Sequence, residues 1–484
     1  MKSIQKKFIA LFAAIIALFV CVGCGGNEID SEFEIITAEQ ILEYDGVIEI
    51  DFRVPSGIIS AALDKMVPEF EKQWNNKIDV SVVTEQSYDT VRSTTILDLN
   101  SKSAPTLVIG YPDHFAEYYS GDHMINLQPY IDAEGDAFKL NDFVDSYITE
   151  NRIADDSDDL YGLPFNKSTE VLVYNKTVFE AMGYELPETW AELETLATQM
   201  NKDAKDGKLD TCVTLNKGET APSQYYKDGL FVPFAYDSTS NAFITMTRQW
   251  NAEYTERVNI DTGYAVFNNE QCKAGLQYFQ GLAKNGLYAV AETFGESYAS
   301  NAFKSLKCLM TIGSSAGVKY NVPEGDKFEI GIAKVPYNGN NPDNKYVIQQ
   351  GTNICILNQN TNYQRAAAWQ LIKYFTSTDV TSRFAIETGG YLPVRKSSYE
   401  SAVYSDYLEN PSLDKIYFSQ SANVALSYLD NGYKFFTDDP FVGSAEVRDA
   451  VGTLFSNIIV NKKDINASIQ NTLNELGPSY QRQN

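Results

Sequence analysis

Histidine is almost absent from this 484-residue chain, which has two, and cysteine is scarce at six. The four cysteines beyond the N-terminal segment show no C-x-x-C spacing, and they are expected to be free thiols or to form a disulfide: Cys212, Cys272, Cys308 and Cys355. The chain also has no H-E-x-x-H motif and no Walker loop. With only His114 and His123, acid–base chemistry would depend on carboxylates. We therefore predict a protein that is not an enzyme and holds no metal or cofactor.

Basic residues are few as well, 39 against 64 acidic ones, which gives a formal net charge of -25. A nucleic-acid binder needs a basic surface to neutralise phosphates, so this class is excluded. There is no internal repeat or coiled-coil run, and the 16 prolines and 30 glycines never gather into a long linker. The 44% hydrophobic content is sufficient for a globular protein of two or three domains.

A single long apolar run is present, residues 8–22, and three lysines precede it. It is short for a bilayer span and typical of a secretion signal. The run ends in Val22-Gly23-Cys24, which resembles a bacterial lipobox except that Cys21 stands where leucine is usual. We predict a lipoprotein signal peptide over 1–23, a lipidated Cys24 at the extracellular face of the cell membrane, and a flexible tether over 24–45. An uncleaved N-terminal anchor helix is the alternative.

Strand and helix patterns alternate after the tether. Strands are expected at 47–55, 77–85 and 105–112, with helices at 56–75 and 88–101 between them, so the fold class is α/β with a largely parallel sheet at its start. Further strands are expected at 307–312, 328–336 and 346–357. Thr189 and Glu192 form a capping box for a helix that starts at residue 190.

The stretch GLPFNKSTEVLVYNK, residues 162–176, places the polar group 166–169 between two apolar segments that both look buried. One interpretation is an ordinary loop whose Asn166 and Ser168 bond to local backbone. The other is a strand that crosses a polar cavity, where buried polar side chains find partners. The residues alone leave both interpretations open.

This stretch is followed by PETWAEL at 187–193 and ETGGYLPVR at 387–395. In this order the motifs resemble the solute-binding proteins of bacterial ABC importers, in the branch that binds sugars and glycerol-3-phosphate. The resemblance covers about residues 46–480 and implies a type II periplasmic-binding-protein-like fold, with two α/β lobes joined by a hinge and the ligand in the cleft between them. It places the N-terminal lobe at 46–165 plus about 340–380, and the C-terminal lobe at 166–339 plus about 381–484. It also implies a monomer that delivers its ligand to ABC permease subunits.

The resemblance further implies a phosphate site made of hydroxyls, one backbone amide and one arginine. By motif, those positions fall on Tyr88, Ser168, Ser314, Gly351, Tyr391 and Arg448. Such a set matches the acceptor-rich phosphate group. Arg448 is expected on a helix capped by Ser444, away from its apolar stripe of Val447, Val451, Leu454 and Ile458. Ser314 could be only a helix cap, Arg448 could pair with an acid, and Gly351 could mark a bulge.

The resemblance is weaker at the polyol end of the pocket. Pro112 stands where the glycerol-3-phosphate binders have a glutamate, and no tryptophan occurs in 212–226. Asp113, Tyr225 and Tyr226 are candidates to compensate. We therefore predict an importer component that captures glycerol-3-phosphate or a related organophosphate or polyol by lobe closure. A binder of mono- or oligosaccharides is the alternative, and a secreted hydrolase is a remote one.

Overall fold

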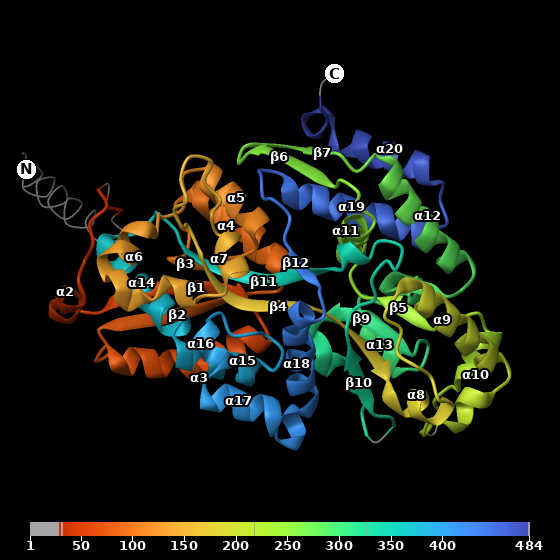
Figure 1. The fold of residues 1–484 in the computed structure, drawn as a ribbon. Helices are drawn as coiled ribbons and strands as arrows, with labels where there is room; N and C mark the ends of the chain where they lie inside the picture. The colour runs from red at the N-terminus through yellow and green to blue at the C-terminus, as the bar shows by residue number, and fades with distance from the viewer. Residues whose placement is uncertain (1–28, 31, 217, 326, 483–484) are drawn as a thin grey trace, which may run out of the picture.

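The computed structural model describes residues 29–482 except 31, 217 and 326. Two α/β lobes lie side by side, with β1–β3 in the left half of Figure 1 and β5, β9 and β10 in the right half. The α/β class expected from the alternating patterns is confirmed. The expected strands and helices are present, with most ends within two or three residues of the predicted positions.

The first lobe is built on three parallel strands. β1 (Ile48–Pro55) lies between β2 (Ile78–Glu85) and β3 (Leu107–Gly110). Its helices include α3 (Ile58–Gln73), α4 (Tyr88–Ser101), α5 (Pro112–Ser120), α6 (Gln128–Glu134), α7 (Asp145–Thr149), α14 (Asn362–Phe375) and α15 (Thr378–Thr388). Trp369 of α14 stacks on Tyr130 of α6, with ring centroids 5.3 Å apart, inside this lobe's core.

The second lobe repeats the arrangement with β9 (Met310–Ser314), β5 (Phe234–Tyr236) and β8 (Tyr288–Val290), again parallel. Its helices include α8 (Lys176–Met182), α9 (Trp190–Lys205), α10 (Pro222–Lys227), α11 (Thr239–Gln249), α12 (Glu270–Lys284), α13 (Ala299–Lys304), α18 (Ile416–Asp430), α19 (Ser444–Ile459) and α20 (Ile465–Leu476). The capping box of Thr189 and Glu192 starts α9 as expected. Trp190 packs edge-on against Phe279 in a separate apolar core, with ring centroids 5.0 Å apart.

Two long strands connect the lobes. β4 (Leu163–Asn175) pairs with β11 (Tyr346–Ile356) along its first half and with β9 and β10 (Ile330–Ala333) along its second half. β11 pairs with β3 of the first lobe at one end and with β12 (Lys434–Phe436) at the other. The residues 166–170 are therefore the middle of a continuous buried strand, and the loop interpretation is wrong.

The polar side chains in the middle of β4 have specific partners in place of water. The Lys167 ammonium is completely buried, pairs with Glu150 and donates to the carbonyl oxygen of Gly351 at 3.2 Å. Burial lowers the pKa of Lys167, and the charge of Glu150 opposes that effect. The Thr169 hydroxyl donates to the Ile348 carbonyl oxygen at 2.8 Å. These bonds tie the two crossing strands to each other between the lobes.

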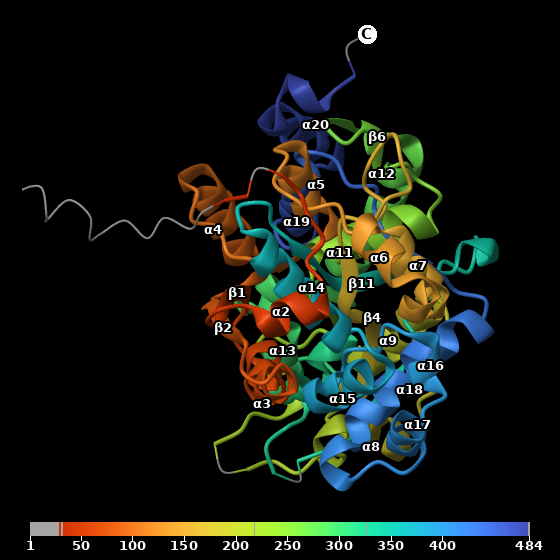
Figure 2. The same cartoon turned by 90° about the vertical axis from the view of Figure 1, so that its left-hand side faces the viewer.

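The segment expected to be a flexible tether is in part ordered. Residues 32–45 pack on the first lobe, where α2 (Ala38–Glu43) lies near α14 (Figure 2). Ile36 and Ile41 are buried in the core of this lobe, and Asn362 bonds to Glu32 and Glu34. The apolar side chains and the capping box of Thr37 explain the difference from the prediction. Cys24 and the predicted signal peptide lie outside the described residues.

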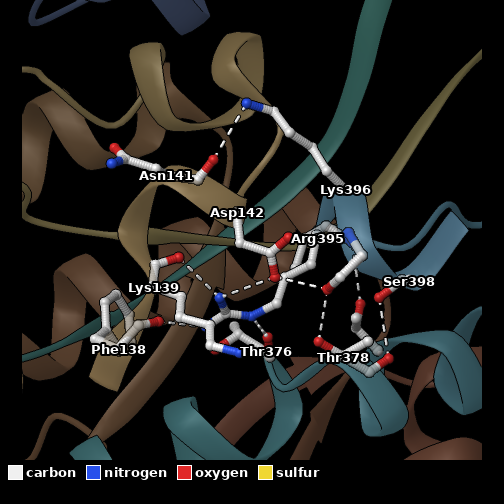
Figure 3. A network of polar contacts seen from close by, with 12 residues as sticks. Phe138, Lys139, Asn141, Asp142, Thr376, Thr378, Arg395, Lys396 and Ser398 are labelled. Carbon is white, nitrogen blue, oxygen red and sulfur yellow. Dashed lines mark hydrogen bonds and ion pairs between the residues drawn. The ribbon is translucent and has the colours of Figure 1, made fainter. Parts of the chain in front are cut away.

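The segment after α15 also belongs with the first lobe. The Arg395 guanidinium is buried and donates to the carbonyl oxygens of Phe138 and Lys139, each at 3.1 Å, as Figure 3 shows. Lys396 and Ser397 bond to the same region of the chain. The prediction placed the return to the second lobe at about residue 381, whereas this packing favours a boundary after residue 398.

The helix that carries Arg448 differs from the prediction at its start. α19 begins at Ser444 with Gly443 as its N-cap, and the Ser444 hydroxyl donates back to the Phe441 carbonyl oxygen at 2.7 Å. The predicted apolar stripe is buried as expected, which leaves Arg448 on another face. Among the described residues, none of the helices is long and apolar enough to cross a membrane.

Candidate functional site

A cavity of about 780 Å³ lies at the junction of the two lobes. Seven of the nine candidate residues from the sequence line it, and they come from seven different segments: Tyr88, Asp113, Ser168, Ser314, Gly351, Tyr391 and Arg448. Tyr88 and Asp113 are at the starts of α4 and α5, and Ser314 ends β9. These segments are distant in the sequence, and the order of the strands in the sheet brings them together. The periodicity of apolar residues along the chain therefore does not predict that they share a cavity.

Two tyrosines meet on the first-lobe wall of the cavity. The hydroxyls of Tyr88 and Tyr391 lie 2.9 Å apart, and the Asn166 amide donates to the Tyr88 hydroxyl at 3.1 Å. The carbonyl oxygen of the Asn166 side chain accepts from Thr352, so Asn166 holds Tyr88 and is itself held by β11. Tyr391 reaches this wall because the Arg395 network fixes the segment after α15 to the first lobe.

Two serines face each other where β4 meets β9. The Ser314 hydroxyl donates to the Ser168 hydroxyl at 3.4 Å and accepts from the Ala316 amide at 3.2 Å. Ser314 is therefore an N-cap, as the alternative held, and also lines the cavity. Both serines keep acceptor and donor capacity toward a solute.

Arg448 is the arginine in the wall of this cavity, and the residue is half-buried. It donates to the side-chain oxygen of Asn241 and makes no ion pair within 4.0 Å across the described part of the chain. Burial lowers the pKa of Arg448, but the nearby Asp113, Asp438, Tyr254 and Tyr111 together raise it by more, so the net shift is upward. The arginine is thus charged and retains free donors.

Carboxylates accompany the arginine in the cavity wall. Asp438 pairs with Arg248 at 3.0 Å, and burial raises its pKa although Arg248 and Arg448 oppose the shift. Burial also raises the pKa of Asp237 to about 6, while the Ala299 amide opposes this by donating to it at 2.6 Å. Asp113 accepts from the His114 amide at the start of α5.

Several lining residues were not found from sequence, among them Tyr111, Asp237, Asn241, Tyr254 and Asp438. No local motif marks them, because each is ordinary in its own segment. Two candidates are corrected: Tyr225 and Tyr226 lie on α10 and pack against the second-lobe core, outside the cavity lining. Gly351 lines the cavity, but its φ of 91° and its contact with Asn166 show that strand packing requires a glycine there.

Residues 313–317 also match G-x-S-x-G, a pattern of hydrolase nucleophiles that bears on the prediction of a protein that is not an enzyme. Its central Ser315 is completely buried, donates to the Gly390 carbonyl oxygen at 3.0 Å and accepts from the Thr169 amide. Its hydroxyl is therefore occupied by backbone partners, and it lacks the exposed position of a nucleophile. Among the described residues, no group of His, Cys, Asp and Glu side chains is arranged to hold a metal ion. The four cysteines are free thiols, as one of the two predictions held.

Residues 65–412 match the family described as bacterial extracellular solute-binding protein. The chain belongs to this family. A multiple sugar-binding protein of Streptococcus mutans is 24% identical over 343 residues, which cover 70% of this chain and 73% of that one. The sn-glycerol-3-phosphate-binding periplasmic protein UgpB of Brucella abortus is 22% identical over 319 residues, 65% of this chain and 66% of that one.

Two solved structures share this fold over most of the length of the chain. A crystal structure of UgpB from Mycobacterium tuberculosis in complex with glycerophosphocholine has a TM-score of 0.70, with 18% identity over 90% of this chain and 98% of that one. A cyclic alpha-maltosyl-1,6-maltose binding protein from Arthrobacter globiformis has a TM-score of 0.65, with 17% identity over 90% and 99%. The two-lobe periplasmic-binding-protein-like fold is confirmed, and so is the prediction of a solute-binding protein of ABC importers.

Proposed function

We propose that this solute-binding protein captures an organophosphate, either glycerol-3-phosphate or a larger phosphodiester, and presents it to ABC permease subunits. The observation that carries the proposal is Arg448, a charged guanidinium in the cavity wall that makes no ion pair within the described residues. Ser168, Ser314 and the two hydroxyls of Tyr88 and Tyr391 line the same cavity. A guanidinium with hydroxyl donors matches the acceptor-only oxygens of a phosphate ester.

The size and charge of the cavity support a larger member of this class. Binding pockets of about 300–1,000 Å³ enclose drug-sized ligands, and a volume of about 780 Å³ lies in that range. A three-carbon phosphate would leave much of this space unfilled. Asp113, which makes no ion pair with lysine or arginine among the described residues, offers acceptors for hydroxyls of the solute beyond its phosphate.

A second candidate solute is a carbohydrate. Carboxylates and tyrosines share the lining, with Asp438, Tyr111 and Tyr254 near Arg448. Such groups bind sugar hydroxyls and sugar faces. A relative carries the name multiple sugar-binding protein, which supports this alternative to the same degree as the UgpB relatives support the first.

Solute capture would proceed by movement of the lobes about the crossing strands β4 and β11. The solute brings the two walls of the cavity together, and closure removes water from around the guanidinium. Closure of this kind gives the permease a state that only the loaded protein reaches.

A thermal-shift screen with titration calorimetry tests the proposed solute. The purified protein is mixed with glycerol-3-phosphate, glycerophosphodiesters, inorganic phosphate, maltose and longer maltodextrins. Stabilisation by a phosphate ester, and by neither inorganic phosphate nor sugars, supports the proposal. Stabilisation by sugars alone would replace it with the carbohydrate alternative.

Attachment at the extracellular face of the membrane through a lipid on Cys24 completes the proposal, with the protein acting as a monomer. Labelling of cells with an alkyne analogue of palmitate tests the attachment. The label is expected on the wild-type chain and is expected to be lost from the C24A variant. Label retained on C24A would place the modification elsewhere.

A further inference from the structure

Glu170 is a buried carboxylate one residue layer behind the cavity wall. It follows Thr169 on β4, is 1% exposed and does not line the cavity. Its two oxygens accept from the Tyr236 hydroxyl at 2.5 Å and from the Asn241 side-chain amide at 2.9 Å. A carboxylate held away from both water and solute needs a reason, because burial opposes its charge.

Asn241 connects this carboxylate to the cavity. Its nitrogen donates to Glu170, and its oxygen accepts from the Arg448 guanidinium. The two ends of an amide differ, because its nitrogen donates and its oxygen accepts. A carboxylate accepts only, so it binds the nitrogen end, and a guanidinium donates only, so it binds the oxygen end. The Glu170 oxygen that accepts from the Asn241 nitrogen therefore fixes which way the amide points, and the amide oxygen then faces Arg448.

We propose that Glu170 positions Arg448 for the solute by acting through Asn241. The inference rests on the proposed function, since Arg448 is the group that would bind the phosphate. Without the acceptor at Glu170, the amide is free to rotate and present its nitrogen to the guanidinium, where two donors would repel each other. Arg448 would then lose the contact that holds it in the cavity wall.

The charged and titratable groups around Glu170 come from four elements besides its own. Tyr236 is on β5 with Asp237 directly after it, Tyr288 is on β8, Tyr428 is on α18 and Arg448 is on α19. Burial raises the pKa of Glu170 to about 7, and the hydrogen bonds from Tyr236 and Asn241 oppose the shift. Arg448 is the cation whose charge acts on this carboxylate. An uncharged side chain would be easier to bury at this position than the carboxyl group of Glu170. The presence of the carboxyl group therefore supports a role for its oxygens as hydrogen-bond acceptors.

Three variants separate positioning from packing. Glu170→Leu removes the acceptor, Glu170→Gln retains an oxygen that can accept from Asn241, and Asn241→Leu cuts the connection while Glu170 remains. Affinity for sn-glycerol-3-phosphate is measured by calorimetry, with maltose as the neutral probe. We expect Glu170→Leu and Asn241→Leu to weaken phosphate-ester binding about tenfold or more, and Glu170→Gln to recover most of that loss.

The control for removing a buried carboxylate is Asp203→Asn on α9. Asp203 is 1% exposed and bonds to Tyr184, Gln199 and Lys208, outside the cavity lining. Its substitution is expected to lower stability without changing affinity, because its hydrogen bonds lie away from the cavity. A loss of affinity in Asp203→Asn as large as in Glu170→Leu would mean that the losses reflect general destabilisation, and would overturn the proposal.

A double-variant comparison tests whether Glu170 acts through the arginine. In an Arg448→Met background, Glu170→Leu is expected to cause no further loss of residual affinity for sn-glycerol-3-phosphate, because both changes remove one interaction. Losses that multiply in the double variant would overturn the proposal. So would an unchanged affinity in Glu170→Leu and Asn241→Leu.

Crystal structures of the proteins without solute test the positioning role of Glu170 independently of which solute the protein binds. In the wild type and Glu170→Gln, the Arg448 guanidinium is expected on the Asn241 oxygen; in Glu170→Leu it is expected to be displaced. If the wild type binds no phosphate ester, the proposed function fails, and a displaced guanidinium still supports the positioning role. A guanidinium that stays in place in Glu170→Leu, or in Asn241→Leu should the first variant not fold, overturns it.

Discussion

A Cβ atom at Gly351 would lie 1.9 Å from the backbone carbonyl oxygen of Asn166 on the neighbouring crossing strand. The two residues are at the point where β4 and β11 pass between the lobes, next to a shift in their register. Gly351 has a φ of 91°, in the region that residues with a Cβ rarely adopt. The lobes are therefore joined where the strands approach too closely for any side chain.

Gly351→Ala is expected to lower the free energy of unfolding by about 3 kcal/mol or more, because it adds both a backbone clash and a strained φ. Urea unfolding followed by circular dichroism measures the change. Gly281→Ala is the matched control, since a Cβ there meets nothing within 4 Å in the interior of α12 and should stabilise by up to about 1 kcal/mol. Equal stability of the two variants would show that the crossing strands can separate to admit a methyl group.

Arg448→Met is expected to weaken the binding of a phosphate ester about 100-fold or more, and that of a neutral sugar far less. A guanidinium can make two charge-assisted hydrogen bonds to one phosphate, and methionine retains the bulk while it removes them. Calorimetry on both probes measures the selectivity. Arg383→Met removes an arginine that pairs with Glu69 on the first lobe and should change neither affinity. Undiminished phosphate-ester affinity in Arg448→Met would exclude the organophosphate proposal.

The order of strands and helices was predictable because alternation of apolar residues is a local signal. The helix at Tyr88–Ser101 begins and ends where the sequence indicated, and the capping box before Trp190 is present. Pairing between distant segments is not local. That Tyr88 and Tyr391 line one cavity came from the resemblance to solute-binding proteins and not from periodicity, and the pairing of β4 with β11 was not predicted.

The features that the sequence did not predict depend on what packs over each segment. Residues 32–45 are polar and acidic overall, yet Ile36 and Ile41 are buried in the core of the first lobe and Asn362 bonds to the same segment. Likewise, Asn241 lies in the first turn of an ordinary helix, and its contact with Arg448 depends on how α11 packs against α19. Composition averages over a segment and therefore misses single anchoring side chains.

Glu170 should make the stability of the protein depend on pH. Burial raises its pKa from the ordinary 4.5 to about 7, so the folded state holds this proton more tightly than the unfolded state. Its contribution to stability is fully present below pH 4.5 and is lost as the pH rises to about 7, a change of about 3 kcal/mol. The difference in free energy of unfolding between the wild type and Glu170→Gln should therefore fall over this range.

Urea unfolding at several pH values between 4.5 and 7.5 measures this difference. Asp237, whose pKa is raised to about 6, acts in the same direction but is present in both proteins and cancels. A difference that stays constant, or that grows as the pH rises, would mean that Glu170 is ionised throughout this range in the folded protein.

An ion pair joins the two lobes beside the cavity. Arg92 of α4 pairs with Glu117 of its own lobe and with Glu446 of α19 in the other lobe. Glu446 lies two residues before Arg448, so this pair joins the lobes beside the cavity. A movement of the lobes changes the distance from Arg92 to Glu446 but not the distance to Glu117. The pair therefore favours the arrangement in which the two walls of the cavity are close.

Glu446→Gln is expected to weaken solute binding by up to about fivefold at low salt, because its carboxylate is 46% exposed and such pairs contribute less than about 1 kcal/mol. The effect should disappear at high salt, where exposed charges are screened. Glu329→Gln removes an exposed pair with Lys176 inside the second lobe and should leave affinity unchanged. Calorimetry at two salt concentrations measures both variants. Tighter binding by Glu446→Gln would show that the pair instead holds the lobes apart.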